Sequence, residues 1–303
     1  MLFFAVLFGL LMLVAAWLTD GILRLVLLGI LYFAEAELLT MLVRAKRKEP
    51  DRSKMTKEER IKAEDQWYIQ RQDPAVMARM RPVGVVLHIV TVGVSLMNMI
   101  GVRPYTLWSL LGLACFAVCV LLCTLFPAYF SFSYMEKEKN RKMTFPIVNL
   151  LIPFMLSIGI NTIRAFDQFC FTGGFQVLEG LLVTAAIVGL VLRLAVTEFR
   201  RHIGNWLGAM FFLLIFGFGI AAPLNHVLDF TPPETIEATV VEYHPGSGKN
   251  GPRYTFLLEN REEVNLSANV GFSSRGYQVG EQTELEYHGG GFGLPYYCYP
   301  DQK

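Results

Sequence analysis

Charged side chains are scarce in this sequence of 303 residues. They make up 17% of it, whereas a typical soluble domain contains about 25%. Hydrophobic residues make up 53%, and many fall in long runs with few charges. Runs of roughly eighteen or more such residues can cross the hydrocarbon core of a bilayer as helices. The scarcity of charge therefore excludes an ordinary soluble domain and predicts an integral membrane protein.

The sequence also lacks the short motifs that identify common enzyme and metal sites. It contains no Walker loop, nucleophile elbow, Rossmann fingerprint or HExxH motif, and no Cys/His cluster with the spacing of metal ligands. We therefore expect no catalytic residues, no bound metal and no cofactor.

Basic residues are few in the C-terminal part of the chain and frequent near its start. Residues 229–303 carry five basic and eleven acidic side chains, whereas residues 44–81 carry twelve basic and seven acidic ones. An acidic soluble end argues against nucleic-acid binding, which requires a basic face. The expected partners are the lipid bilayer and a protein that docks on the C-terminal part or on 44–81.

Seven apolar runs predict seven transmembrane helices, because a backbone inside lipid must satisfy its own hydrogen bonds. The first run lacks a basic start and a small-x-small cleavage site, so we expect an uncleaved span rather than a signal peptide. The predicted spans are residues 2–18, 22–43, 83–101, 106–127, 145–163, 175–196 and 205–224.

Lys and Arg are concentrated in every second connection between these runs. Segments 44–81, 134–143 and 197–204 hold clusters of them, and the intervening connections hold at most one. Because basic loops stay in the cytoplasm, this alternation predicts a multi-pass plasma-membrane protein with a cytoplasmic N-terminus. The predicted transmembrane domain, residues 1–228, then precedes an extracytoplasmic domain, residues 234–303.

The cytoplasmic segment 44–81 carries two helix-start signals. Thr56 and Glu59 have the spacing of a capping box, and Asp73 precedes Pro74, a residue favoured at the first helical position. We therefore expect helices in this segment that lie near anionic lipid headgroups.

The C-terminal residues have a strand pattern. A β-branched run over 236–243 precedes alternating apolar residues around 254–258, 264–266 and 283–287, with Gly-rich or polar turns between them. Four or five short strands in a segment this small predict an all-β barrel or sandwich. We expect the Gly-rich stretch 289–293 and its aromatic neighbours to dock on the helices.

Four short motifs stand out in this segment: Ala238-Thr239-Val240-Val241-x-Tyr243, Tyr254-x-Phe256, Tyr277-x-Val279-Gly280 and Thr283-x-Leu285-x-Tyr287. With these residues the segment resembles a small bacterial β domain of unknown function that often occurs beside transmembrane helices. The resemblance covers about residues 235–300 and implies a fold but no chemistry.

Charges within the predicted spans are the first candidates for a function, because each costs about 2.5–3.5 kcal/mol at mid-membrane. The second and sixth spans carry opposite charges at similar depths. We therefore expect these spans to be neighbours, with Arg24 facing Glu179 and Arg193 facing Glu35 or Glu37.

Histidines and cysteines supply the remaining candidates. His88 is the histidine candidate because it lies inside the third span, whereas His202 and His226 sit at helix ends and His244 and His288 flank strand ends. Cys170 and Cys298 are the two cysteines expected outside the cytoplasm, so they are a candidate disulfide pair. Three further cysteines, Cys115, Cys119 and Cys123, form one stripe of the fourth span and are expected to allow close helix packing.

The favoured function is a non-enzymatic membrane protein that presents a small β domain for binding, sensing or assembly. One alternative is a transporter or channel that uses the charges of the second and sixth spans. Another is an intramembrane enzyme that uses Glu35, Glu37 or His88. A polar cavity that joins Glu35, His88 and Arg193 would favour these alternatives.

Overall fold

The computed structural model describes most of the chain, and the following statements concern that part of it. The described ranges are 21–46, 55–56, 58–59, 62–63, 66–67, 70–132, 148–246, 252–270, 273–274 and 276–300. The predicted first span, 2–18, and the predicted basic loop, 134–143, lie outside these residues.

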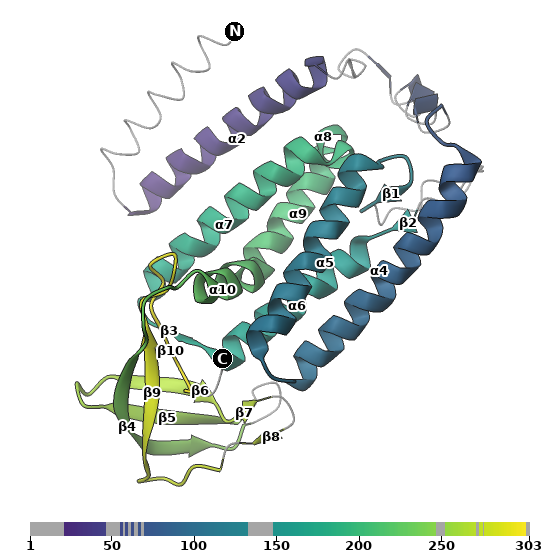
Figure 1. The fold of residues 1–303 in the computed structure, drawn as a ribbon. Helices are drawn as coiled ribbons and strands as arrows, with labels where there is room; N and C mark the ends of the chain where they lie inside the picture. Colours follow the sequence, from purple (N-terminus) through teal and green to yellow (C-terminus); the bar gives the residue numbers. More distant parts are fainter. Residues whose placement is uncertain are drawn as a thin grey trace.

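Eight helices form a bundle in the described part of the chain (Figure 1). The central helix, α6, contacts α4, α5, α9 and α10, while α2 lies at one side against α7. The helices are α2 (Gly21–Lys46), α4 (Pro74–Ile100), α5 (Tyr105–Leu125), α6 (Leu151–Gln168), α7 (Gly174–Ala195), α8 (Thr197–Arg201), α9 (Ile203–Phe216) and α10 (Phe218–Val227).

Both helix-start signals of segment 44–81 are confirmed. The backbone amide of Thr56 donates to the Glu59 carboxylate over 2.7 Å, and the Glu59 amide donates to the Thr56 hydroxyl over 3.3 Å. Asp73 is the N-cap of α4, where its Oδ1 accepts from the Ala75 amide at 2.8 Å, and Pro74 is the first residue of the helix. Short side-chain caps thus fix where these helices begin.

The predicted count of seven spans is not supported. Within the described residues, α4, α5 and α7 are long and apolar enough to cross a membrane, and the bent pair α9–α10 is a fourth candidate if it is one span. The run predicted over 145–163 instead forms α6, which begins at Leu151. Its last turns contain Asn161, Arg164, Asp167 and Gln168, so α6 has a polar face toward the other helices, while Ile152 and Ile163 on its outer face are exposed.

The run predicted over 205–224 is broken near Gly217, where α9 and α10 meet with a bend of 52°. Thr162 on α6 satisfies the backbone groups that the bend frees. Its hydroxyl donates to the Phe216 carbonyl over 2.7 Å and accepts from the Gly219 amide over 2.9 Å. The side-chain amide of Asn161 donates to the Gly219 backbone carbonyl over 3.3 Å. Side chains of a neighbouring helix therefore make the break tolerable in an apolar interior.

Four strands of the C-terminal part lie where the sequence predicted them, and a six-stranded antiparallel sheet contains them. Its strand order is β3–β10–β9–β4–β5–β6. The strands are β3 (Cys170–Phe171), β4 (Glu234–His244), β5 (Arg253–Leu258), β6 (Glu263–Ser267), β9 (Gln282–His288) and β10 (Tyr296–Cys298). Two minor pairs are β1 (Phe130–Ser131) with β2 (Val148–Asn149), and β7 (Asn269–Val270) with β8 (Ser273–Ser274).

The sheet curls until its edge strands β3 and β6 touch, so it is nearly a barrel. Alternating side chains of β4, β5 and β6 fill its interior, among them Val240, Phe256 and Leu266. Strand β3 belongs to the connection between α6 and α7 rather than to the C-terminal segment. The helical part of the chain therefore supplies one strand of the sheet.

We expect Thr162→Val to destabilise the bundle by about 1–3 kcal/mol, because it leaves the Phe216 carbonyl and the Gly219 amide buried without their side-chain partner. Unfolding in mixed detergent, followed by circular dichroism, measures the change. Thr124→Val is the matched control, since Thr124 donates only to Val120 O of its own helix. Equal losses in the two variants would contradict the role given to Thr162.

Candidate functional site

Two paired strands, β9 and β10, carry four chemically versatile side chains on one face. His288 lies directly opposite Tyr296, and Glu286 lies directly opposite Cys298. Because side chains alternate along a strand, these four share the face that is turned away from the sheet's interior. His288, Tyr296 and Cys298 are buried and Glu286 is partly buried, because the helices cover this face.

His288 is held between two carboxylates. Its Nε2 lies 3.2 Å from Oε2 of Glu286, and its Nδ1 lies 3.6 Å from Oδ2 of Asp229, which follows the end of α10. The side chains of His288 and Asp229 are only 6% and 3% exposed. The Gly290 amide donates to Asp229 Oδ2 over 2.8 Å. These contacts fix the orientation of the imidazole ring.

Asp229 is charged at neutral pH. Burial raises the pKa of its carboxyl group, but hydrogen bonds from the hydroxyl and amide of Thr231 and from the Gly290 amide lower it further than burial raises it. The net effect is a pKa below the usual range for aspartate. The junction between helices and sheet therefore contains a buried negative charge directed at His288.

Tyr296 connects the sheet to α10. Its ring stacks on His288, with centroids 4.8 Å apart, and its hydroxyl lies 2.5 Å from Nδ1 of His226. Burial raises the pKa of Tyr296, and the neighbouring thiol of Cys298 raises it further. The phenol therefore keeps its proton, and its hydroxyl forms a hydrogen bond with Nδ1 of His226. Phe169, before β3, packs edge-on against the Tyr296 ring.

The connection between β9 and β10 is fixed to α10 by Asn225, as expected for the Gly-rich stretch. The buried side-chain amide of Asn225 donates to the Leu294 carbonyl over 2.9 Å and accepts from the Phe292 backbone amide over 2.9 Å. The backbone carbonyl of Asn225 accepts from the Gly291 backbone amide over 2.8 Å. The side chain and backbone of Asn225 together hold the connection against α10.

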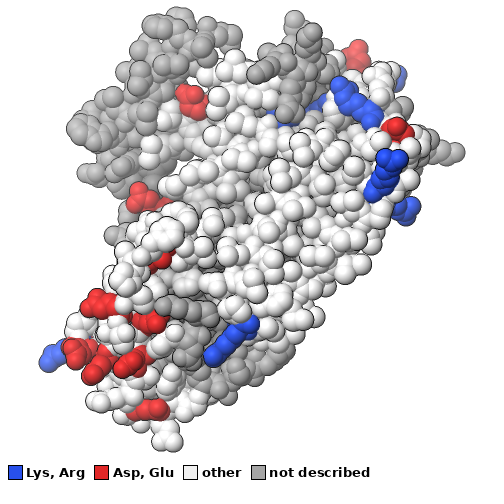
Figure 2. Space-filling view, in the orientation of Figure 1, with Lys and Arg blue, Asp and Glu red and all other residues white. Residues whose placement is uncertain are grey.

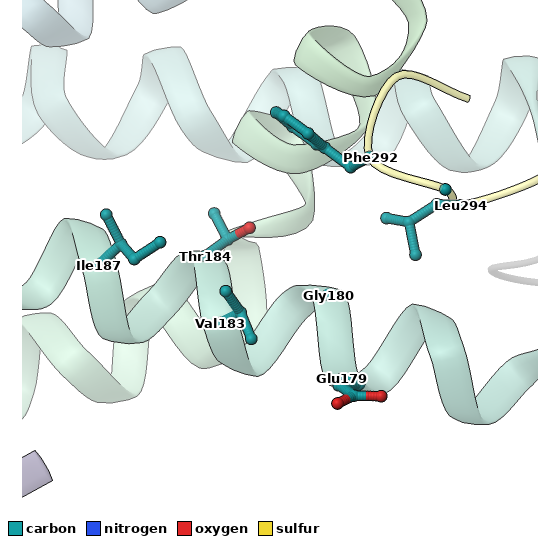
Figure 3. A pocket seen from close by; sticks show the side chains of 8 residues that line it. Glu179, Gly180, Val183, Thr184, Ile187, Phe292 and Leu294 are labelled. Carbon is teal, nitrogen blue, oxygen red and sulfur yellow. The ribbon is translucent and has the colours of Figure 1, made fainter. Parts of the chain in front are cut away.

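A cavity of about 440 Å³ lies between α7 and this connection (Figure 3). Phe292 and Leu294 reach over α7, where a β-carbon at Gly180 would lie 2.9 Å from the Leu294 side chain. The remaining walls are mostly apolar, and Glu179 is the charged residue among them. Glu179 thus lines a groove at the end of α7 that is next to the sheet.

The expected ion pair between α2 and α7 is present. Arg193 pairs with Glu37, one of its two predicted partners, and also donates to the Phe199 carbonyl. Its guanidinium lies 4.9 Å from the centre of the Trp206 ring. The predicted partner of Glu179 is Arg24, a residue of α2 whose side chain is outside the described part of the structure.

The other intramembrane candidates do not meet. Glu35 is partly buried on α2, whereas the His88 Nδ1 lies 2.8 Å from the Gly84 carbonyl of its own helix, α4. Helix α2 packs on α7, and α4 packs on α5 and α6 at the opposite side of the bundle (Figure 1). The arrangement therefore does not group His88 with Glu35 and Arg193.

The candidate disulfide between Cys170 and Cys298 is not formed. Cys170 of β3 pairs with Tyr297, not with Cys298. A shift of one residue moves a side chain to the other face of a sheet. Cys170 therefore packs against the interior of the sheet, and Cys298 faces the helices.

The sequence contained a signal for this cluster that a search for metal motifs does not detect. Glu286-x-His288 and Tyr296-x-Cys298 both have the spacing of one strand face, and a Gly-rich connection separates them. If that connection is treated as a hairpin turn, the four side chains fall on one face. The contributions of His226 and Asp229 depend on the end of α10 and had no local signal.

No protein-family model, curated protein or solved structure matches this chain. The similarity of residues 235–300 to a small bacterial β domain therefore stays a prediction.

We expect Asn225→Ala to loosen the connection between β9 and β10 without unfolding the sheet, because it removes two hydrogen bonds to Phe292 and Leu294. Each lost bond costs about 0.5–1.5 kcal/mol. Hydrogen exchange should become faster at residues 289–295. Asn260→Ala, in the exposed turn between β5 and β6, is the control, and unchanged exchange in Asn225→Ala would contradict the assignment.

We expect Glu37→Gln to lower the free energy of unfolding by about 1–2 kcal/mol, because the buried guanidinium of Arg193 loses its carboxylate while Glu37 is itself partly exposed. Unfolding in mixed detergent measures the loss. Glu35→Gln, two residues earlier on α2, should change stability far less. The reverse order would show that Glu35 is the partner of Arg193.

Proposed function

We propose that this chain is a non-enzymatic integral membrane protein that presents its sheet outside the cytoplasm for binding or sensing. The observation that carries the proposal is the separation of charge along the molecule (Figure 2). In this view most acidic side chains gather over the sheet and most basic ones lie at the opposite end, with a largely uncharged surface between them. The hydrocarbon core of a bilayer matches the uncharged surface, and the two charged ends match the aqueous phases on either side.

The surfaces of the candidate spans support a lipid environment. Ile89 on α4 is 67% exposed and Ile187 on α7 is 59% exposed. Exposed apolar side chains on several long helices are costly in water and favourable in lipid. Because basic ends stay in the cytoplasm, the proposed orientation leaves the acidic sheet on the other side.

The attachment of the sheet supports a role in sensing rather than a loosely tethered binding domain. Strand β3 comes from the bundle, and Asn225 joins α10 to the connection between β9 and β10. A ligand that shifts β9 or β10 therefore acts directly on α10. Helix α10 continues from the bend at Gly217, and Thr162 of α6 binds both sides of that bend, so a shift of α10 also reaches α6.

The transporter alternative is less favoured. A broken span is typical of transporter sites, where freed backbone groups bind the substrate. Here Thr162 and Asn161 occupy the groups that the break frees. The enzyme alternative has little support, since Glu35 and His88 lie on helices that do not pack together.

Labelling of single cysteines tests the orientation. In a variant whose five natural cysteines are serines, we expect Glu237→Cys on the sheet to react with a membrane-impermeant maleimide in intact cells. Arg79→Cys, at the exposed start of α4, should react only after permeabilisation. The opposite pattern, or reaction of both in intact cells, would overturn the proposed orientation.

A further inference from the structure

We propose that Glu286, His288 and Cys298 form a binding site for a zinc-class transition-metal ion at the junction of helices and sheet. One ligand atom from each residue lies within 4.8 Å of the other two. Zinc bonds of about 2.0–2.3 Å require ligand atoms about 3.3–3.8 Å apart in a tetrahedral site. Small side-chain rotations therefore bring the three groups to bonding distance. The site is independent of the proposed function and orientation.

The donor atoms select the class of metal. The site offers an imidazole nitrogen, a thiol sulfur and a carboxylate oxygen, which is a mixed set that zinc and cobalt accept. Magnesium and calcium prefer oxygen ligands alone, so they do not fit a site that includes Cys298. Binding at neutral pH displaces the proton of the Cys298 thiol, because the thiolate is the ligand.

Asp229 gives the histidine the support that metal ligands usually have. A ligating imidazole typically donates its second N–H to a carboxylate, which fixes the tautomer and makes the ligating nitrogen more basic. The Nδ1 of His288 lies 3.6 Å from Oδ2 of Asp229, an ion-pair distance that must shorten to form such a hydrogen bond, and its Nε2 lies 3.2 Å from Glu286. Asp229 is itself held by the Gly290 amide.

The pairing of β9 with β10 places the three ligand residues close together without a bound metal. Glu286 and Cys298 are directly opposite in the antiparallel ladder, and His288 is two residues along the same strand as Glu286. Cys298 is 1% exposed and the side chain of Glu286 is 14% exposed. The partly exposed carboxylate is therefore the side from which an ion enters. Three protein ligands leave a fourth position for water or a small anion.

A cluster that only stabilises the fold would behave differently from a metal site. Without any metal, His288 still contacts Glu286 and Asp229, and neither contact involves sulfur. A role for the Cys298 thiol therefore distinguishes a metal site from a purely structural cluster. Cys170 provides a matched control, because it lies on the neighbouring strand β3 with its side chain on the other face.

Cobalt titration of the full chain in detergent, with any histidine tag removed, tests the site. We expect one Co²⁺ per chain, a thiolate-to-cobalt charge-transfer band and visible bands of tetrahedral intensity. Zinc should displace them. Cys298→Ser should abolish the charge-transfer band, and Cys170→Ser should retain it. Asp229→Asn should retain the band but weaken the affinity about 10–100-fold.

A second measurement tests the site even if the Cys298→Ser protein fails to fold. In the Cys170→Ser chain, Zn²⁺ should protect Cys298 from alkylation, as measured by mass spectrometry, and His288→Gln should remove this protection. The absence of a charge-transfer band in the wild type, its persistence in Cys298→Ser, or alkylation that is insensitive to zinc would overturn the proposal.

Discussion

The pairing of β3 with β10 is the contact on which the junction between bundle and sheet depends. Cys170 and Phe171 are the only two residues of β3, yet they pair with Tyr297 and Tyr296, and the Thr172 amide adds a hydrogen bond to the Pro295 carbonyl. This pairing fixes the register of β10 relative to α6 and α7. The positions of Tyr296 and Cys298 beneath α10 follow from it, as does the near closure of the sheet.

Several polar groups in the helical interior are satisfied by partners from distant parts of the sequence. Asn98 of α4 donates to Asn161 of α6 over 2.8 Å, and Asn161 donates to the Ser109 carbonyl of α5 over 3.0 Å. At the other end, Arg200 donates to the last carbonyls of α7 and is fully buried. A low-dielectric interior makes each such bond costly to lose. The same network therefore specifies which helices are neighbours.

Local rules predicted the local features. The Asp73–Pro74 start, the Thr56–Glu59 capping box and the strands around residues 236–287 depend on neighbouring residues, and the structure confirms them. Complementary charge at similar depth indicated the Arg193–Glu37 pair. Each of these features depends on neighbouring residues or on position along the sequence, so it can be predicted without knowledge of the tertiary contacts.

The errors arose where the outcome depends on tertiary contacts. An apolar run predicted α6 as a span, but its buried polar residues are stable only because α4, α5 and α10 surround them. Strands β3 and β10 are too short to have a pattern of their own. The Glu286–His288–Cys298 cluster and the separation of Cys170 from Cys298 both depend on the strand register, which no spacing within one segment reveals.

The place of β3 in the chain has a consequence for assembly. Strand β3 is synthesised before α7, α9 and α10, whereas its partner β10 comes near the end of the chain. Until then β3 has an unpaired edge, and the aromatic surface around Phe169 lacks the ring of Tyr296. A chain cut short before β10 therefore keeps an open strand edge, which invites pairing with other chains. Strand β10 thus closes the strand edge that β3 leaves open until β10 is made.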